Sequence, residues 1–107
     1  MSETDIQRTI LEGLWYNRVI AWRYQNIPVP IRQGGRITGL RRVDQNNIGL
    51  PDIMAIYKGM FYGIEVKTRI GRQSKDQKEW ERKINEAGGK YILARSWEDV
   101  KEGMKLC

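Results

Sequence analysis

Apolar side chains near the start of the chain recur at the period of a helix. From Ser2 to about Arg18 they lie three or four residues apart, as they do along one helix face. They are Ile6, Ile10, Leu11 and Leu14. Ser2, followed three residues later by Asp5, is able to cap the first turn. The pattern predicts an opening helix over this segment.

The following stretch changes from a strand pattern to no sustained pattern. Residues 19 to 29 are rich in β-branched and aromatic side chains, so we expect a strand in the middle of this segment. Pro28 and Pro30 stop it, because proline has no N–H to donate to a strand ladder. Residues 31 to 51 contain four glycines, which predicts a long loop with room for a short strand or turn. A long loop in a compact domain is often functional.

A β-hairpin is predicted in the middle of the chain. Residues 52 to 57 form a short apolar run, Lys58 and Gly59 supply a turn, and residues 61 to 68 resume an apolar pattern. A basic, glycine-containing link follows over residues 69 to 73. The pattern therefore predicts two antiparallel strands that lead into this link.

The last third of the chain alternates helix and strand. Ser74 begins a helix that extends to about Ala87, where two glycines end it. Residues 90 to 95 form an apolar strand, and Ser96 with Asp99 opens a final helix. Strand, helix and strand in succession favour a crossover with parallel pairing, whereas the hairpin supplies antiparallel pairing.

The predicted order of elements is α-β-β-β-α-β-α. We expect one α/β domain over residues 1 to 107, with a mixed sheet of about four strands flanked by helices. The length suits one modest hydrophobic core and is too short for two.

The charge of the chain indicates a polyanionic partner. The 19 Lys and Arg against 13 Asp and Glu give a net charge of +6, and the pI is about 9.7. Such a balance is typical of nucleic-acid binding, and also of a basic surface that is merely solvated. The basic side chains gather in two stretches. They are Arg32, Arg36, Arg41 and Arg42 in the first, and Lys67, Arg69, Arg72, Lys75 and Lys78 in the second.

Two residue types that often carry catalysis are scarce. Histidine is absent, and the single cysteine is Cys107, so carboxylates, Lys, Tyr and Ser are left for any chemistry. One cysteine excludes an intrachain disulfide and a cysteine-based zinc site. The chain shows no secretory leader and no apolar run near the roughly 18 residues of a membrane helix. We expect a soluble intracellular protein, in the cytoplasm of a bacterium or of the host of a virus.

Three charged residues interrupt the apolar pattern of the hairpin. Glu65 and Lys67 are two positions apart, so on a strand their side chains leave the same face. Asp52 lies 13 residues before Glu65, at the start of the neighbouring strand. A hairpin of that length brings the two carboxylates and the lysine together.

This combination suits hydrolysis of a phosphodiester bond. Two unpaired carboxylates repel each other, and Mg²⁺ relieves the repulsion while it keeps waters and accepts phosphate oxygens. Lys67 is able to orient the attacking water or to stabilise charge in the transition state, and both roles stay open. The alternative interpretation makes Glu65 and Lys67 an exposed strand face and Asp52 a turn residue. The short, otherwise apolar strand counts against it, because burying such a pair without a ligand is costly.

At this point the residues resemble a known family. Pro51-Asp52 followed by Glu65-Val66-Lys67 resembles the signature of PD-(D/E)XK nucleases, and the whole pattern resembles the small stand-alone viral and bacterial members of the VRR-Nuc branch. The supporting motifs are residues 2 to 7, 21 to 23, 49 to 53, 63 to 67, 74 to 77 with Trp80, 87 to 89, and 95 to 96 with 98 to 100. The resemblance implies a restriction-endonuclease-like fold and a Mg²⁺- or Mn²⁺-dependent endonuclease.

The resemblance also implies roles for particular residues. Asp52 and Glu65 would be metal ligands, together with the backbone carbonyl of Val66, and Lys67 would be the catalytic lysine. Gln77 matches the glutamine that the family places on a helix near the site. Because Ser74-x-x-Gln77 is also a capping box, a catalytic role and a capping role both stay open.

The family further places a metal-binding glutamate on the first helix. Glu3 and Glu12 are both available. Glu3 is the better match, because it lies in the Ser-Glu-x-x-Ile context of the family, whereas Glu12 has the character of an exposed helix residue.

The expected substrate is DNA, above all branched DNA such as a Holliday junction. The candidate DNA-binding residues are Arg36, Arg41, Arg42, Arg69, Arg72 and Lys75. Stand-alone relatives, including phage proteins, imply a homodimer with two active sites. Four tryptophans and five tyrosines suit a dimer interface, although all of them are also able to lie in the core.

Two other hypotheses remain at this stage. The chain would be a non-catalytic module that binds nucleic acid through its basic loops, or a nuclease subunit active only in a larger complex for packaging or recombination. The presence of Asp52, Glu65 and Lys67 together favours the enzyme, because a pure binding module has no need of them.

Overall fold

A mixed four-stranded sheet lies at the centre of the protein. The computed structural model describes residues 1–24, 28–42 and 48–106, and the side chains of these residues apart from 28, 29 and 42. The strand order is β1-β4-β5-β6, in which β5 and β6 pair in parallel and the other neighbours pair antiparallel. The strands are β1 (Ile20–Arg23), β4 (Ile53–Tyr57), β5 (Met60–Val66) and β6 (Lys90–Ala94). The predicted hairpin and the parallel crossover are therefore confirmed.

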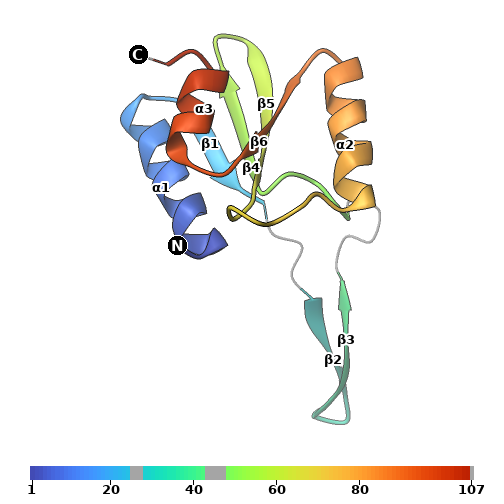
Figure 1. The fold of residues 1–107 in the computed structure, drawn as a ribbon. Coiled ribbons are helices and arrows are strands. Elements are labelled where there is room, and N and C mark those ends of the chain that lie inside the picture. Colours follow the sequence, from blue (N-terminus) through green and yellow to red (C-terminus); the bar gives the residue numbers. More distant parts are fainter. Residues whose placement is uncertain (25–27, 43–47, 107) are drawn as a thin grey trace.

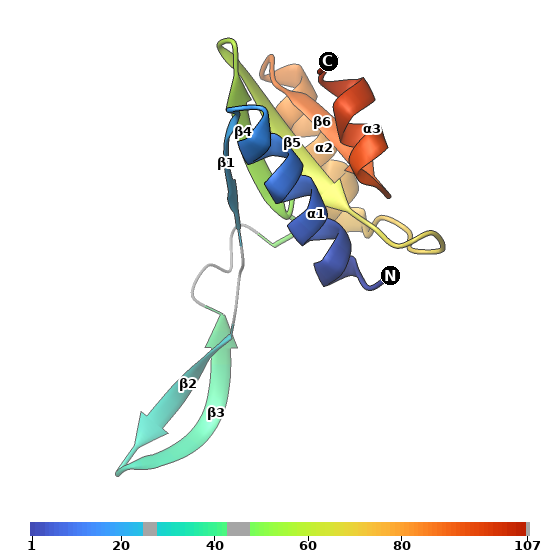
Figure 2. The same ribbon diagram turned by 90° about the vertical axis from the view of Figure 1, so that its left-hand side faces the viewer.

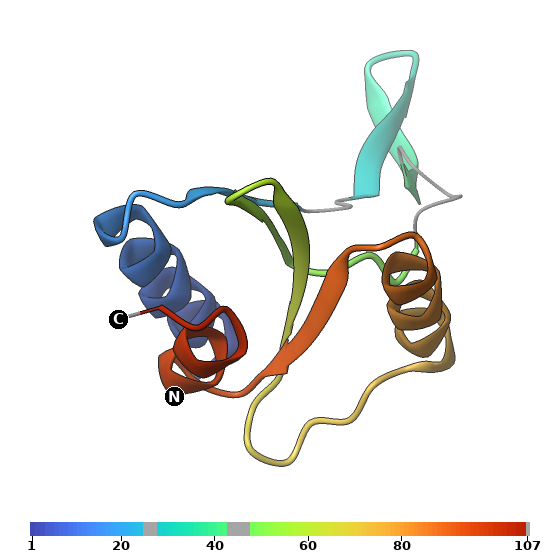
Figure 3. The same ribbon diagram turned by 90° about the horizontal axis from the view of Figure 1, so that it is seen from above.

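Three helices cover the two faces of this sheet. They are α1 (Glu3–Tyr16), α2 (Lys75–Glu86) and α3 (Trp97–Gly103). Viewed from above, α1 and α3 lie on one side of the sheet and α2 on the other (Figure 3). Ser2, Ser74 and Ser96 cap the three helices, each accepting a hydrogen bond from the backbone N–H three residues later. The serines thus determine where each helix begins, as the sequence predicts.

The core lies between the sheet and the pair α1 and α3. All four apolar residues of the predicted helical face of α1 are buried. They pack against alternate residues of β4 and β5, because alternate strand side chains share one face. These strand residues are Ile53, Ala55, Tyr62, Ile64 and Val66. Each fully buried aliphatic side chain of this kind contributes about 1.5–3 kcal/mol.

Two further strands lie in the segment for which the sequence predicts a long loop. β2 (Pro28–Gln33) and β3 (Arg36–Arg42) pair antiparallel as a separate two-stranded sheet. We call this pair the ribbon, and it extends away from the central sheet (Figures 1 and 2). Gly34 and Gly35, both with positive φ, form its two-residue turn.

The ribbon corrects two expectations. The order is α-β-β-β-β-β-α-β-α, and Pro28 begins β2 and Pro30 lies inside it instead of ending a strand. A two-stranded ribbon tolerates proline because each strand has an outer edge that needs no N–H donor. The Gly34-Gly35 pair was the signal for the hairpin.

In the part of the chain that the structure describes, no helix is long and apolar enough to span a bilayer.

One end of the central sheet gathers the starts and ends of several elements. The registers align Arg23 at the end of β1 with Ile53 at the start of β4 and with Ile64 near the end of β5. α1 and α2 both begin at this end, and the ribbon departs from it (Figure 1). The charged residues of the predicted site lie at the same end.

Candidate metal centre

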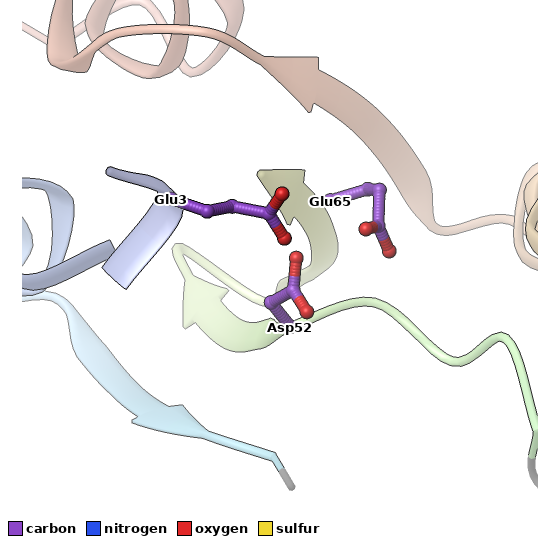
Figure 4. A group of neighbouring side chains, drawn as sticks. All are labelled: Glu3, Asp52 and Glu65. Atoms are coloured by element: carbon purple, nitrogen blue, oxygen red, sulfur yellow. The ribbon is translucent and has the colours of Figure 1, made fainter. Parts of the chain in front are cut away.

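Three carboxylates from three elements meet at this end of the sheet. Glu3, Asp52 and Glu65 each place one carboxylate oxygen within 4.8 Å of the others (Figure 4). Ile53 pairs with Ile64, so Asp52 lies opposite Glu65 one step further along the antiparallel ladder. The Ser2 cap starts α1 so that Glu3 lies in its first turn. Local pairing and capping thus bring the three side chains together.

Asp52 is held by backbone contacts on both sides. Its Oδ2 accepts a hydrogen bond of 2.8 Å from the N–H of Val66. Its own carbonyl accepts a 2.8 Å hydrogen bond from the N–H of Tyr24, which joins the end of β1 to the start of β4. The carboxylate therefore has a defined orientation beside the end of β5.

Glu65 is the most unusual group of the cluster, because it is a charged residue that is only 1% exposed. Its Oε2 accepts a hydrogen bond of 3.0 Å from Gln77 Nε2 and lies 3.8 Å from Lys67 Nζ. Its Oε1 is buried and has no hydrogen-bond partner among the described residues. The alternative of an exposed amphipathic strand is therefore wrong.

Burial dominates the acidity of Glu65. Loss of solvent, followed by the neighbouring charge of Asp52, raises the pKa of Glu65 to about 9, and Lys67 only partly opposes this. Without a cation, the site thus favours a proton on Glu65 at neutral pH. A divalent cation supplies the charge that would favour the ionised form.

The donor set fits a hard divalent cation. Three convergent carboxylates offer oxygen ligands, which Mg²⁺ and Mn²⁺ prefer. A buried carboxylate oxygen without a partner is costly, and a metal ion would satisfy it. The N–H of Val66 points to Asp52, and in a strand the carbonyl of the same residue points to the same side. The Val66 carbonyl is thus directed to the Asp52 side of β5.

Gln77 performs two structural tasks at once. Its Oε1 accepts the Ser74 N–H at 2.8 Å, and Ser74 Oγ accepts the Gln77 N–H at 3.2 Å, so the capping box is present. Its Nε2 simultaneously donates to Glu65. The capping interpretation and the position near the site are therefore compatible, because the amide has two different ends.

The structure brings Glu3 rather than Glu12 to the cluster. Glu12 lies nine residues further along α1, about two and a half helical turns away, and is exposed. The Nζ of Lys67 lies beside Glu65, and its side chain is 13% exposed. All the residues expected at the centre of the site thus share one end of the sheet.

The predicted DNA-binding residues separate into two groups. Arg69, Arg72 and Lys75 are exposed on and beside the link between β5 and α2, which follows Lys67 directly. Arg36 and Arg41 lie on the ribbon, outside the carboxylate cluster. Arg42 ends β3, and its side chain lies outside the described part of the structure.

Sequence reasoning gave no role to two residues that support the link. The Nη1 of Arg95 donates to the carbonyls of Thr68, Arg69 and Gly71, at 2.5, 3.3 and 2.9 Å. Gln73 Nε2 donates to Glu81 and to the hydroxyl of Tyr91. Burial raises the pKa of this hydroxyl. The Arg95-Ser96 motif was visible in the sequence, although nothing in its spacing predicted this contact.

Comparison with known proteins supplies a structural match. No family model and no curated protein matches the chain. A solved structure described as "VRR_NUC domain" superposes with a TM-score of 0.65. The match covers 97% of this chain and 95% of the other, at 16% sequence identity. The two proteins therefore share their architecture over nearly their whole length.

Proposed function

We infer that this chain, which has the fold of a VRR_NUC domain, is a nuclease that hydrolyses phosphodiester bonds with a divalent metal ion. The observation that carries the proposal is the nearly complete burial of Glu65 inside a cluster of three carboxylates, with no hydrogen-bond partner for its Oε1 among the described residues. A non-catalytic binding module gains nothing from such a cluster, because burying a glutamate beside a second carboxylate without a cation is costly.

The proposed ligands of the metal are Glu3, Asp52, Glu65 and the Val66 carbonyl. A bound Mg²⁺ would supply Lewis-acid stabilisation of the phosphate and a more acidic water. Gln77 holds Glu65 by its amide, and the Val66 N–H holds Asp52, so neither carboxylate has to reorganise. Lys67 places a positive charge beside Glu65, where it is able to orient water or to stabilise charge on the phosphate.

The proposed substrate is DNA, and branched DNA in particular. The exposed cations Arg69, Arg72 and Lys75 lie beside the carboxylate end of the sheet, where they would bind the phosphates on either side of the cut. Paired cuts at a four-way junction need two active sites at a fixed separation, which a homodimer provides.

An exposed apolar surface supports the homodimer. Ile20 and Trp22 on the edge strand β1 and Ile56 on β4 are all exposed, and Ile20 pairs directly with Ile56. Trp15 and Tyr16, at the end of α1, are exposed as well. Apolar groups of this size are typical of protein interfaces.

Cleavage assays on labelled four-way junction, matched duplex and single-stranded DNA test the proposal. With Mg²⁺ or Mn²⁺ we expect cutting, and with chelator none. Asp52→Asn, Glu3→Gln and Lys67→Ala should each reduce the rate by roughly 100-fold or more, because each removes a group at the reacting phosphate. The matched controls are Glu12→Gln on the same helix and the exposed Lys101→Ala on α3.

Each outcome has a definite meaning. Paired cuts on the junction alone would support the resolvase and the homodimer, which sedimentation equilibrium checks independently. Equal rates for Asp52→Asn, Lys67→Ala and the control variants would refute the proposed site. Metal-independent binding without cutting would favour the binding module or a subunit that needs a partner.

A further inference from the structure

The ribbon has the composition of a surface for a polyanion. Between Tyr24 and Val43 the sequence contains four arginines and no carboxylate. Arg32, Arg36 and Arg41 are exposed on the ribbon. The ion pairs found among the described residues involve Arg8, Lys67 and Arg82 instead. The charges of Arg32, Arg36 and Arg41 are therefore available to a partner.

The ribbon also exposes apolar side chains. Ile37 is 58% exposed and Leu40 is 65% exposed. Pro30 pairs with Leu40 and Arg32 pairs with Ile37, so these side chains share one face of the ribbon. An isolated two-stranded hairpin is only marginally stable in water, and it gains stability when such a face is covered. Both the exposed arginines and the exposed apolar side chains of the ribbon therefore favour binding to a partner.

The position of the ribbon relates it to the carboxylate cluster. It is inserted between the end of β1 and the start of β4, where the Tyr24 N–H binds the Asp52 carbonyl. Figures 1 and 2 show that it extends from this end of the sheet, and it lengthens the molecule to 55 Å against 29 Å in the other two directions. The seven residues of β3 reach roughly 23 Å at about 3.3 Å per residue.

We propose that the ribbon enters a groove of double-helical DNA beside the site of cleavage, which rests on the proposed function. The major groove, about 12 Å wide, accommodates a two-stranded β-ribbon. Arg32, Arg36 and Arg41 bind phosphates along the groove, while Ile37 and Leu40 pack against apolar sugar and base atoms. The ribbon thus selects a duplex arm next to the cut.

A second copy of the chain is the less favourable occupant. The chain carries a net charge of +6, so an arginine-rich ribbon is not complementary in charge to a second copy, whereas the apolar surface proposed for the homodimer does not depend on charge. Double-helical DNA carries a negative charge about every 1.7 Å along its axis. Charge complementarity therefore favours the duplex.

Duplex binding in an Asp52→Asn background, where no cutting is expected, tests the ribbon directly. Anisotropy of a labelled 30-base-pair duplex across a salt series gives the affinity and its salt dependence. The plot of log K against log salt has a negative slope. The triple variant Arg32→Gln, Arg36→Gln, Arg41→Gln should make this slope shallower by about 2.7, since each lost phosphate contact contributes about 0.9. Its affinity at 0.1 M salt should fall at least about 10-fold.

Two further variants separate charge from groove insertion. Lys90→Gln, Lys101→Gln, Lys105→Gln removes the same charge from exposed positions at the start of β6 and on and after α3, and should change the slope far less. Ile37→Ser with Leu40→Ser should weaken duplex binding while the salt slope stays unchanged, because no phosphate contact is lost. Circular dichroism should show the same melting temperature for all ribbon variants.

The outcomes distinguish this proposal from the proposed function. Unchanged affinity and slope in both ribbon variants would overturn the ribbon as a DNA-binding element, even if the wild-type protein cuts DNA. Conversion of a dimer to a monomer by the ribbon variants in sedimentation equilibrium would assign the ribbon to a second copy and would also overturn it. If the wild-type protein binds duplex through the ribbon but never cuts it, the ribbon is supported as a DNA-binding element and the proposed nuclease activity is refuted.

Discussion

At the scale of single residues, the cluster depends on side chains that satisfy two partners at once. Gln77 accepts the Ser74 N–H with one end of its amide and donates to Glu65 with the other. Asp52 likewise accepts the Val66 N–H while its carboxylate belongs to the cluster with Glu3 and Glu65. Such groups are costly to replace, because one substitution removes a structural contact and a contact of the site together.

Gln77→Glu separates the two tasks of Gln77. Glutamate keeps the acceptor that caps Ser74, but it removes the donor to Glu65 and adds a negative charge there. We expect the free energy of unfolding to fall by roughly 1.5–3 kcal/mol, because the hydrogen bond to the buried Glu65 is lost, and the cleavage rate to fall at least about 10-fold. Urea unfolding and single-turnover cleavage measure the two effects.

Gln77→Ala provides the comparison. It loses the side-chain half of the capping box as well, so it should lower the free energy of unfolding by about 0.5–1 kcal/mol in addition. A wild-type cleavage rate in Gln77→Glu would show that Gln77 acts only as a cap.

At the scale of the elements, the packing of α1 against α3 depends on the absence of a side chain. A Cβ at Gly13 would lie 2.8 Å from three ring atoms of Trp97, closer than atoms normally approach. The indole therefore lies directly against the backbone of α1. Since α1 carries Glu3 and α3 follows β6, this contact helps to hold the first helix on the sheet.

Whether Gly13→Ala raises or lowers the free energy of unfolding depends on Trp97. In a helix with free space, alanine is about 0.8–1 kcal/mol better than glycine. Against Trp97 the added methyl overpacks the contact, which costs about 1–3 kcal/mol. We expect a net loss of about 1 kcal/mol in the wild type and a gain in a Trp97→Ala background. Urea denaturation of the wild type, Gly13→Ala, Trp97→Ala and the double variant measures these changes. Stabilisation by Gly13→Ala in both backgrounds would contradict the close contact between Gly13 and Trp97.

Much of the element order was predictable because its signals are local. The three serine caps, the apolar face of α1 and the Lys58-Gly59 turn each act within a few residues. β2 and β3 were not predicted, since prolines and a glycine-rich composition conceal their pairing. Gly34-Gly35 is a local signal for a turn, but only the register in the structure shows that the segments on its two sides pair.

At the scale of the whole molecule, the buried Glu65 couples the cluster to stability. The pKa of Glu65 rises from 4.5 to about 9 on folding, so the folded protein holds a proton that the unfolded chain releases. A raised acid pKa contributes stability that is full below pH 4.5 and is lost as the pH rises to about 9. The metal-free protein should therefore become less stable from acidic to alkaline pH.

Glu65→Gln should remove this dependence. Urea unfolding with chelator, at several values between pH 5 and pH 9, should give a flatter profile for Glu65→Gln than for the wild type, with the larger difference at high pH. Glu12→Gln, which alters an exposed glutamate, should follow the wild-type profile. Parallel profiles for the wild type and Glu65→Gln would contradict the raised pKa.

By itself, the sequence determined the helix starts, the central hairpin and the α/β class, because these follow from local spacing and residue type. The spacing in the hairpin also predicted that Asp52, Glu65 and Lys67 lie together. The sequence left open Glu3 against Glu12 and capping against proximity for Gln77. The tertiary structure showed that Glu3 lies at the cluster and that Gln77 both caps α2 and contacts Glu65, because distances between elements depend on how α1 and α2 pack on the sheet. It alone also showed the burial of Glu65 and the projection of the ribbon, since burial and reach are properties of the folded chain.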